Sequence, residues 1–264
     1  MTYHTSIARL PRPDVVAPEA LPQYSRRGIL ATWAAAAVPM GLLTWGAAPL
    51  LAHSLDGPSA WPRAIALAMT VGLVWQGVLV VLLVRRETGS LRWPVVKQAL
   101  WLRAPVSPRS GRVGGRLWWV LVPLTLALIV KEMLPSLPSP DDRDLGTFLA
   151  SSEGQEWLSG NWVWFTVIVT MFLFNTVLGE ELLFRGLLLP RMNGAFGRAD
   201  WIANGVLFGL YHLHVPWAMY KSVIGGTFVL AYPTKRYRSA LIGIAVHSVN
   251  SVVFTALVLA LVLQ

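Results

Sequence analysis

Apolar runs long enough to be membrane-spanning helices follow one another through most of this chain. They cover residues 29–52, 64–84, 117–134, 161–179, 200–214, 216–232 and 240–262. A helix that crosses a bilayer needs about 20 apolar residues, and most of these runs reach or approach that length. The sequence therefore predicts an all-α fold, a polytopic transmembrane helix bundle of about seven spans. An eight-span variant would need one more apolar run than these seven. Separately, the run from 161 can continue as one helix through 191.

The composition agrees with an integral membrane protein. Hydrophobic residues make up 55% of the chain and charged residues only 13%, whereas roughly 25% of a soluble domain is charged. Cysteine is absent, which excludes disulfides, thiolate metal sites and cysteine nucleophiles. The formal net charge is +9, but the basic residues lie in loops between apolar runs. We therefore expect the lipid bilayer as a partner, and no nucleic acid.

Loop charge gives the predicted bundle an orientation, because positive residues collect on the cytoplasmic side of a membrane. The loop 85–116 is strongly basic, whereas the segment 135–160 is acidic. With seven spans, a cytoplasmic N-terminus places the basic clusters inside, and the C-terminus is then extracytoplasmic. The predicted organisation is a flexible cytoplasmic arm (1–28), N-terminal transmembrane helices (29–134), an acidic extracytoplasmic loop (135–160) and a C-terminal set of helices (161–264).

Three charged residues lie together at predicted membrane depth, where ionisable groups are costly and mark functional sites. They are Glu180, Glu181 and Arg185, between two apolar runs. On a helix, Glu181 and Arg185 are spaced i, i+4 and can form an ion pair, which leaves the carboxylate of Glu180 free for proton transfer. A free carboxylate in a low-dielectric site suits a general base. The alternative is a helix end at the interface, where these charges are simply solvated.

Two histidines lie in other apolar runs of the C-terminal region. His212 follows Phe208 by one helical turn, and His247 is followed by Asn250 and Ser251 at i+3 and i+4. A lone histidine in an apolar helix is also compatible with a packed core residue, and Asn and Ser with hydrogen bonds between membrane helices. Taken together, the carboxylates, the arginine, the histidines and the asparagine predict one polar site on the last helices.

The ordered set Glu-Glu-x-x-x-Arg, Phe-x-x-x-His and His with a following Asn resembles the CPBP family of intramembrane proteases, over roughly residues 160–262. This family includes the Ras-converting CAAX endopeptidases and bacterial Abi proteins linked to bacteriocin processing or self-immunity. The resemblance implies an intramembrane endopeptidase, multi-pass in a bacterial-type cell membrane, with a catalytic cavity open to the cytosol. Its substrate would be a protein or peptide in or at the membrane, prenylated at a CAAX motif or bearing a leader.

The resemblance implies a role for each residue of the set. By position, Glu180 matches the glutamate that activates water. Glu181 and Arg185 match its supporting partners. His212 matches the histidine that helps to position this water, and His247 matches the histidine that stabilises the oxyanion.

The sequence departs from the family pattern at one place. The family's asparagine usually follows the oxyanion histidine by four residues. Here Ser251 holds that position after His247, and Asn250 is at i+3. Either side chain could donate the second hydrogen bond to the oxyanion.

Three alternatives follow from the same residues. Glu180, His212 and His247 form a two-histidine, one-carboxylate set of the kind that holds catalytic zinc, but the chain has no HExxH pair and we expect no metal. A non-catalytic immunity or scaffold protein of the same fold would account for the altered asparagine spacing. A proton-coupled transporter also uses intramembrane Glu and His, but its polar residues would extend through the membrane and not gather near one side.

Overall fold

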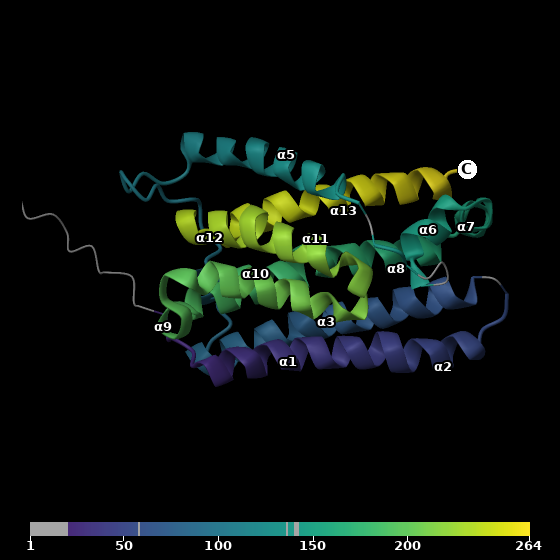
Figure 1. Cartoon of the computed structure of the whole chain (residues 1–264), viewed down its shortest axis with the longest axis horizontal. Coiled ribbons are helices and arrows are strands. Elements are labelled where there is room, and N and C mark those ends of the chain that lie inside the picture. The colour runs from purple at the N-terminus through teal and green to yellow at the C-terminus, as the bar shows by residue number, and fades with distance from the viewer. Residues whose placement is uncertain (1–20, 58, 136, 140–142) are drawn as a thin grey trace, which may run out of the picture.

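The computed structural model describes residues 21–57, 59–135, 137–139 and 143–264. These residues form a helical bundle (Figure 1) and contain no β-strand apart from an isolated bridge between Val106 and Val113. The α-helices are α1 (Arg26–Leu42), α2 (Ala48–His53), α3 (Ala60–Thr88), α4 (Trp93–Ala99), α5 (Leu121–Glu132), α6 (Leu145–Ala150), α7 (Ser152–Leu158), α8 (Trp162–Leu173), α9 (Asn193–Phe196), α10 (Asp200–Tyr211), α11 (Met219–Ile224), α12 (Tyr232–Tyr237) and α13 (Ala240–Val262). The all-α prediction is confirmed.

Several of these helices are joined without a break by tighter or wider turns. The π-helical segments are η1 (Leu43–Ala47), η4 (Phe174–Gly179), η5 (Leu182–Leu188) and η10 (Gly225–Ala231). The 3₁₀ segments are η2 (Gly115–Val120), η6 (Leu189–Arg191), η7 (Gly197–Ala199), η8 (His212–His214) and η9 (Pro216–Ala218). Wide π turns of this kind occur frequently at functional sites.

Four helical runs in the described residues are long and apolar enough to cross a membrane. They are Arg26–His53, Ala60–Thr88, Trp162–Arg191 and Ala240–Val262. The first two contain the predicted runs 29–52 and 64–84, the third overlaps the run 161–179, and the fourth coincides with the run 240–262. The third continues well beyond the predicted span 161–179, because π-helical turns carry the helix through Gly179 to residue 191.

The other three predicted spans are helical but shorter or more polar. α10 has 12 residues, which at 1.5 Å per residue rise about 18 Å, less than the ~30 Å hydrocarbon core of a bilayer. The run from α11 through α12 is longer but carries Lys221, Lys235 and Arg236. The run 117–134 is divided between η2 and α5. The count of seven spans therefore stays a prediction.

Two predicted loops contain helices, and the predicted N-terminal arm ends early. α4 lies within the loop 85–116, and α6 and α7 lie within the acidic segment 135–160. Side-chain caps explain the short helices, since Asp144 and Ser151 accept hydrogen bonds from the first amides of α6 and α7. Ser25 caps α1 in the same way, so the helix begins inside the predicted arm. Residues 1–20 of that arm lie outside the described residues.

The oppositely charged segments lie at opposite ends of the bundle's long axis (Figure 1). We call one end the basic end: it holds the start of α1, α9, the end of α12 and the segment 101–107, which is hydrogen-bonded to residues 237–240. The acidic segment with α6 and α7 lies at the other end, with the C-terminus (Figure 1). The positive-inside rule expects such a separation.

The backbones of α3 and η4 approach closely just before the paired glutamates. A Cβ at Gly179 would collide with the carbonyl oxygens of Leu73 and Phe174, and one at Gly77 would crowd the Leu178 carbonyl. Glycine at these two positions lets the helices touch through their backbones. This contact brings α3 against the segment that carries the candidate site.

Candidate active site

Glu180 and Glu181 lie in a helical turn between η4 and η5, inside the bundle. Their residues are only 2% and 0% exposed, and Arg185 is 0% exposed. The alternative of solvated charges at a helix end is therefore wrong for this arrangement. Burial of adjacent carboxylates is costly unless they are paired and hydrogen-bonded, so their partners decide what each can do.

Glu181 is held from two sides. Its Oε1 forms an ion pair with Nη1 of Arg185 at 3.1 Å, at the predicted i, i+4 spacing, and lies 3.0 Å from Nδ1 of His247 on α13. Arg185 in turn donates from Nη2 to the Gly226 carbonyl at 3.2 Å, and its guanidinium carbon lies 4.0 Å from the centre of the Phe208 ring. The Glu181–Arg185–His247 network thus joins η5, η10, α10 and α13.

Two glycines make room for this network. Gly243 precedes His247 by one turn of α13, and a Cβ there would collide with Oε2 of Glu181. A Cβ at Gly226 would collide with the Phe208 ring and crowd Nη2 of Arg185. Any larger side chain at either place would displace a member of the network.

Glu180 has free acceptor capacity. Its Oε2 is buried and has no hydrogen-bond partner among the described residues. Glu181, Arg185 and the Tyr211 hydroxyl are close enough for electrostatic interaction, and the Tyr211 hydroxyl accepts a hydrogen bond from the buried amide of Gln76 on α3. As the sequence predicted, Glu181 carries the ion pair, whereas Glu180 does not.

His212 lies just after the end of α10 and is fixed by its own helix. Its Nδ1 lies 2.8 Å from the Phe208 carbonyl oxygen. A carbonyl only accepts hydrogen bonds, so Nδ1 carries the proton and Nε2 of the neutral ring is an acceptor. The Phe208 ring makes edge contacts with His212 and His247, at centroid distances of 4.8 and 6.1 Å. The structure therefore gathers both histidines around Phe208.

Asn250 and Ser251 bond to other helices. Nδ2 of Asn250 donates to Oε1 of Glu132 on α5, and Oγ of Ser251 donates to the Phe172 carbonyl on α8, both at 3.5 Å. Bonds of this length are weak. Their partners, Glu132 and Phe172, are not members of the Glu181–Arg185–His247 network, so the structure does not bring Asn250 and Ser251 into it.

The described residues contain no group of three or more His, Asp or Glu side chains placed to hold a metal ion. Nδ1 of His247 already faces Glu181, and Nδ1 of His212 faces the Phe208 carbonyl. These contacts occupy Nδ1 and leave Nε2 of each ring as the atom that could reach a metal ion, so the absence of a metal stays a prediction.

Three residues at the site were not expected from the sequence. Gln76 is an amide within the apolar run 64–84, and the rule that polar residues at membrane depth mark functional sites would have found it. Tyr211 and Gly243 give no comparable signal, because their importance depends on contacts with other helices.

Residues 161–253, about a third of the chain, match the family model described as type II CAAX prenyl endopeptidase Rce1-like. The matched region includes the paired glutamates and both histidines of the site. Neither a curated protein nor a solved structure matches the chain.

Proposed function

We propose that this chain is an intramembrane protease of the CAAX type, as its match to the Rce1-like family model over residues 161–253 suggests, and that it hydrolyses a peptide bond of a membrane-associated protein with Glu180 as the general base. One observation carries the proposal. Oε1 of Glu181 is engaged by Arg185 and His247, whereas Glu180 forms no ion pair among the described residues and its buried Oε2 has no hydrogen-bond partner there. Two carboxylates in one site then have separate tasks, one in pairing and one in proton transfer.

The hydrolytic step uses Glu180 and His212 together. Glu180 takes a proton from a water molecule as the water oxygen attacks the scissile carbonyl, and it later gives that proton to the leaving amine. Nε2 of His212 accepts a hydrogen bond from the same water and orients it, because Nδ1 is occupied by the Phe208 carbonyl. The tetrahedral intermediate then collapses with cleavage of the C–N bond.

His247 is the proposed donor to the oxyanion. Its Nδ1 lies 3.0 Å from Oε1 of Glu181, which holds the ring by one nitrogen and leaves Nε2 as the nitrogen that donates to the oxyanion. Such a preorganised donor in a water-poor site stabilises developing negative charge. Asn250 and Ser251 remain candidates for a second donor, although in this conformation they are hydrogen-bonded to Glu132 and to the Phe172 carbonyl.

Alanine substitutions of His247, Asn250 and Ser251 test which of these residues donates a hydrogen bond to the oxyanion. We expect His247→Ala to lower the turnover number by about 10²–10³-fold, the usual cost of one oxyanion donor. Asn250→Ala and Ser251→Ala should cost less than about tenfold each, since loss of their weak bonds to Glu132 and Phe172 removes little. The measurement is single-turnover cleavage in proteoliposomes. If Asn250→Ala or Ser251→Ala lowers turnover as much as His247→Ala does, α13 rotates during the reaction and the substituted residue is a donor to the oxyanion.

A chelator tests the metal alternative. Because no three-ligand group is present among the described residues, we expect turnover to be unchanged after dialysis against 1,10-phenanthroline. Metal analysis of the purified protein by mass spectrometry accompanies the assay. Activity that is lost with the chelator and returns with stoichiometric zinc would contradict the glutamate mechanism.

The name of the matched family suggests a prenylated substrate, and charge suggests an orientation. We propose that the basic end of the bundle, with the N-terminus, faces the cytoplasm. The assay therefore compares a farnesylated C-terminal peptide with its unmodified counterpart in liposomes. Preferential cleavage of the farnesylated peptide supports a CAAX-type substrate, whereas equal cleavage favours a leader-bearing or other membrane protein.

A further inference from the structure

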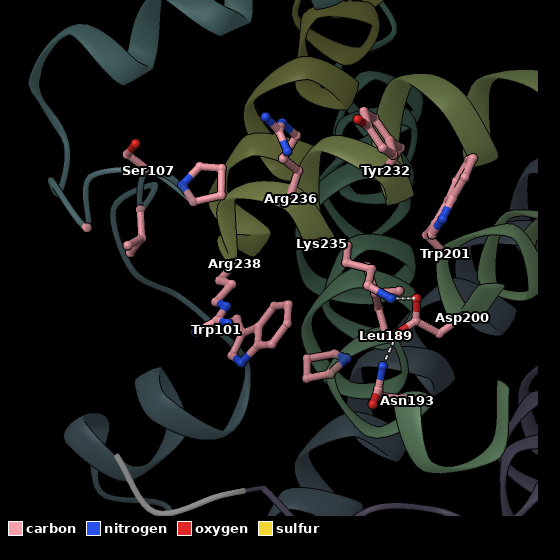
Figure 2. Close-up of a pocket in the computed structure, with 14 residues that line it drawn as sticks. Trp101, Ser107, Leu189, Asn193, Asp200, Trp201, Tyr232, Lys235, Arg236 and Arg238 are labelled. Atoms are coloured by element: carbon pink, nitrogen blue, oxygen red, sulfur yellow. Dashed lines mark hydrogen bonds and ion pairs between the residues drawn. The ribbon is translucent and has the colours of Figure 1, made fainter. Parts of the chain in front are cut away.

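A pocket of about 770 Å³ opens at the basic end of the bundle (Figure 2). It lies between α12, the start of α10, the segment 189–193 and the loop 101–111. None of the residues of the candidate active site lines it in the described part of the chain. Its lining combines aromatic and basic side chains: Trp101, Trp201, Tyr232, Lys235, Arg236 and Arg238.

The pocket carries positive charge without a matching acid. Arg236 and Arg238 are exposed and form no ion pair within the described residues. The acidic residue of the lining, Asp200, is buried and already bound by Lys235 and by Nδ2 of Asn193. The lining therefore includes two arginines, Arg236 and Arg238, whose guanidinium groups have no acidic partner among the described residues.

A third guanidinium, that of Arg103, contacts the backbone of Arg238. Nε of Arg103 donates to the Arg238 carbonyl at 2.8 Å, and its guanidinium lies against the Trp101 ring at 5.4 Å. Burial and the neighbouring charge of Arg238 lower the pKa of Arg103 below its ordinary value. This crowding of like charges favours an anion in the pocket.

The backbone around the pocket is held in a conformation that side chains disfavour. Trp101 and Arg238 both have φ of 49°, and no other non-glycine residue in the described part of the chain has a positive φ. Hydrogen bonds fasten the two strained segments together, from the Ala240 amide to the Trp101 carbonyl at 3.0 Å and from the Ser239 hydroxyl to the Arg103 carbonyl at 2.5 Å. Strain of this kind gathers at ligand-binding sites.

An exposed apolar surface begins at the edge of the pocket. The Trp201 ring packs against Phe228 and Tyr232, at centroid distances of 5.9 and 5.1 Å, and Phe228 is 61% exposed. The packed helices α10, η10 and α11 continue this surface away from the basic end with further exposed residues, namely Ile202, Val206 and Leu210 on α10 and Ile224 at the end of α11. A ligand in the pocket therefore has an apolar path beside it.

We propose that this pocket binds the phosphate headgroup of an anionic phospholipid, whose acyl chain lies on the apolar surface beside Trp201 and Phe228. Guanidinium groups match the geometry of phosphate oxygens, and aromatic residues favour the level of the headgroups. A soluble phosphate would use the arginines but not the apolar surface. The site is additional to the proposed peptidase and does not depend on it.

The test measures lipid binding by the full chain in detergent, with tryptophan fluorescence or native mass spectrometry as the readout. The probes are dioctanoyl phosphatidylglycerol, dioctanoyl phosphatidylcholine and glycerol 3-phosphate. We expect phosphatidylglycerol to bind at least about tenfold more tightly than either of the others. Glycerol 3-phosphate binding as tightly as the lipid would overturn the lipid assignment in favour of a soluble phosphate.

Matched variants locate the binding. The double variant Arg236→Gln/Arg238→Gln should weaken phosphatidylglycerol binding by about 10- to 30-fold, and because both residues are exposed the fold is kept. The control Arg27→Gln/Arg86→Gln removes the same charge from exposed residues at the same end outside the pocket and should change the affinity by less than about threefold. An equal loss in both double variants, or no loss in the first, would overturn the site.

Discussion

Replacement of Glu180 by Gln lowers the turnover number by about 10²–10⁴-fold, the contribution typical of a positioned general base. The amide keeps the shape of the side chain but cannot take a proton from water. Because Oε2 of Glu180 has no hydrogen-bond partner among the described residues, the substitution removes no ion pair and should not lower the thermal unfolding temperature. The measurement is single-turnover cleavage of the farnesylated peptide in proteoliposomes, together with thermal unfolding in detergent.

A matched control separates this effect from a general change of charge. Glu156→Gln makes the same change at an exposed position of α7 and should leave cleavage unaltered. If Glu180→Gln also cleaves at the normal rate, Glu180 is not the base; if the unaltered protein cleaves neither peptide, the non-catalytic alternative of an immunity or scaffold protein is favoured. If it is inactive and folded, it can trap the substrate, because binding is retained without hydrolysis.

Replacement of Arg185 by Met should destabilise the protein by about 3–5 kcal/mol, the usual cost of breaking a buried ion pair from one side. Methionine has a similar length but leaves the Glu181 carboxylate, which is 0% exposed, without its 3.1 Å partner. The measurement is equilibrium or thermal unfolding in detergent. Arg86→Met, at an exposed position of α3, serves as the control and should cost less than about 0.5 kcal/mol.

A double variant tests whether the loss comes from the stranded charge. Glu181→Gln/Arg185→Met removes both charges and should recover part of the stability lost in the single variant. Activity should not recover, because His247 then lacks its carboxylate partner. A double variant as unstable as the sum of the two single variants would mean that the pair contributes through packing alone.

The features that the sequence predicted are those that local spacing controls. The apolar runs predicted the four long helices because length and hydropathy are sufficient for a membrane span. The pairing of Glu181 with Arg185 followed from i, i+4 spacing on a helix. The short helices α6 and α7 were not expected, because they depend on capping by Asp144 and Ser151 more than on apolar length.

The features that were not predicted depend on how the helices are rotated against one another. The contact of His247 with Glu181 joins residues far apart in the chain, and no periodicity within one helix specifies it. The same rotation of α13 decides that Asn250 meets Glu132 and Ser251 meets the Phe172 carbonyl. Motif order predicted that these residues share one region, but the partner of each side chain required the packed structure.

The π-helical turns on both sides of the paired glutamates determine how this helix responds to insertions and deletions of residues. A π turn holds one residue more than an α turn, so η4 and η5 are equivalent to insertions absorbed within a helix. Removal of the extra residue there would convert the π turn into an α turn, so the helix would stay continuous and the side chains beyond it would keep their directions. A deletion between Glu181 and Arg185 would, however, shorten the i, i+4 spacing on which their ion pair depends, whereas changes in the connecting loops leave that spacing unchanged.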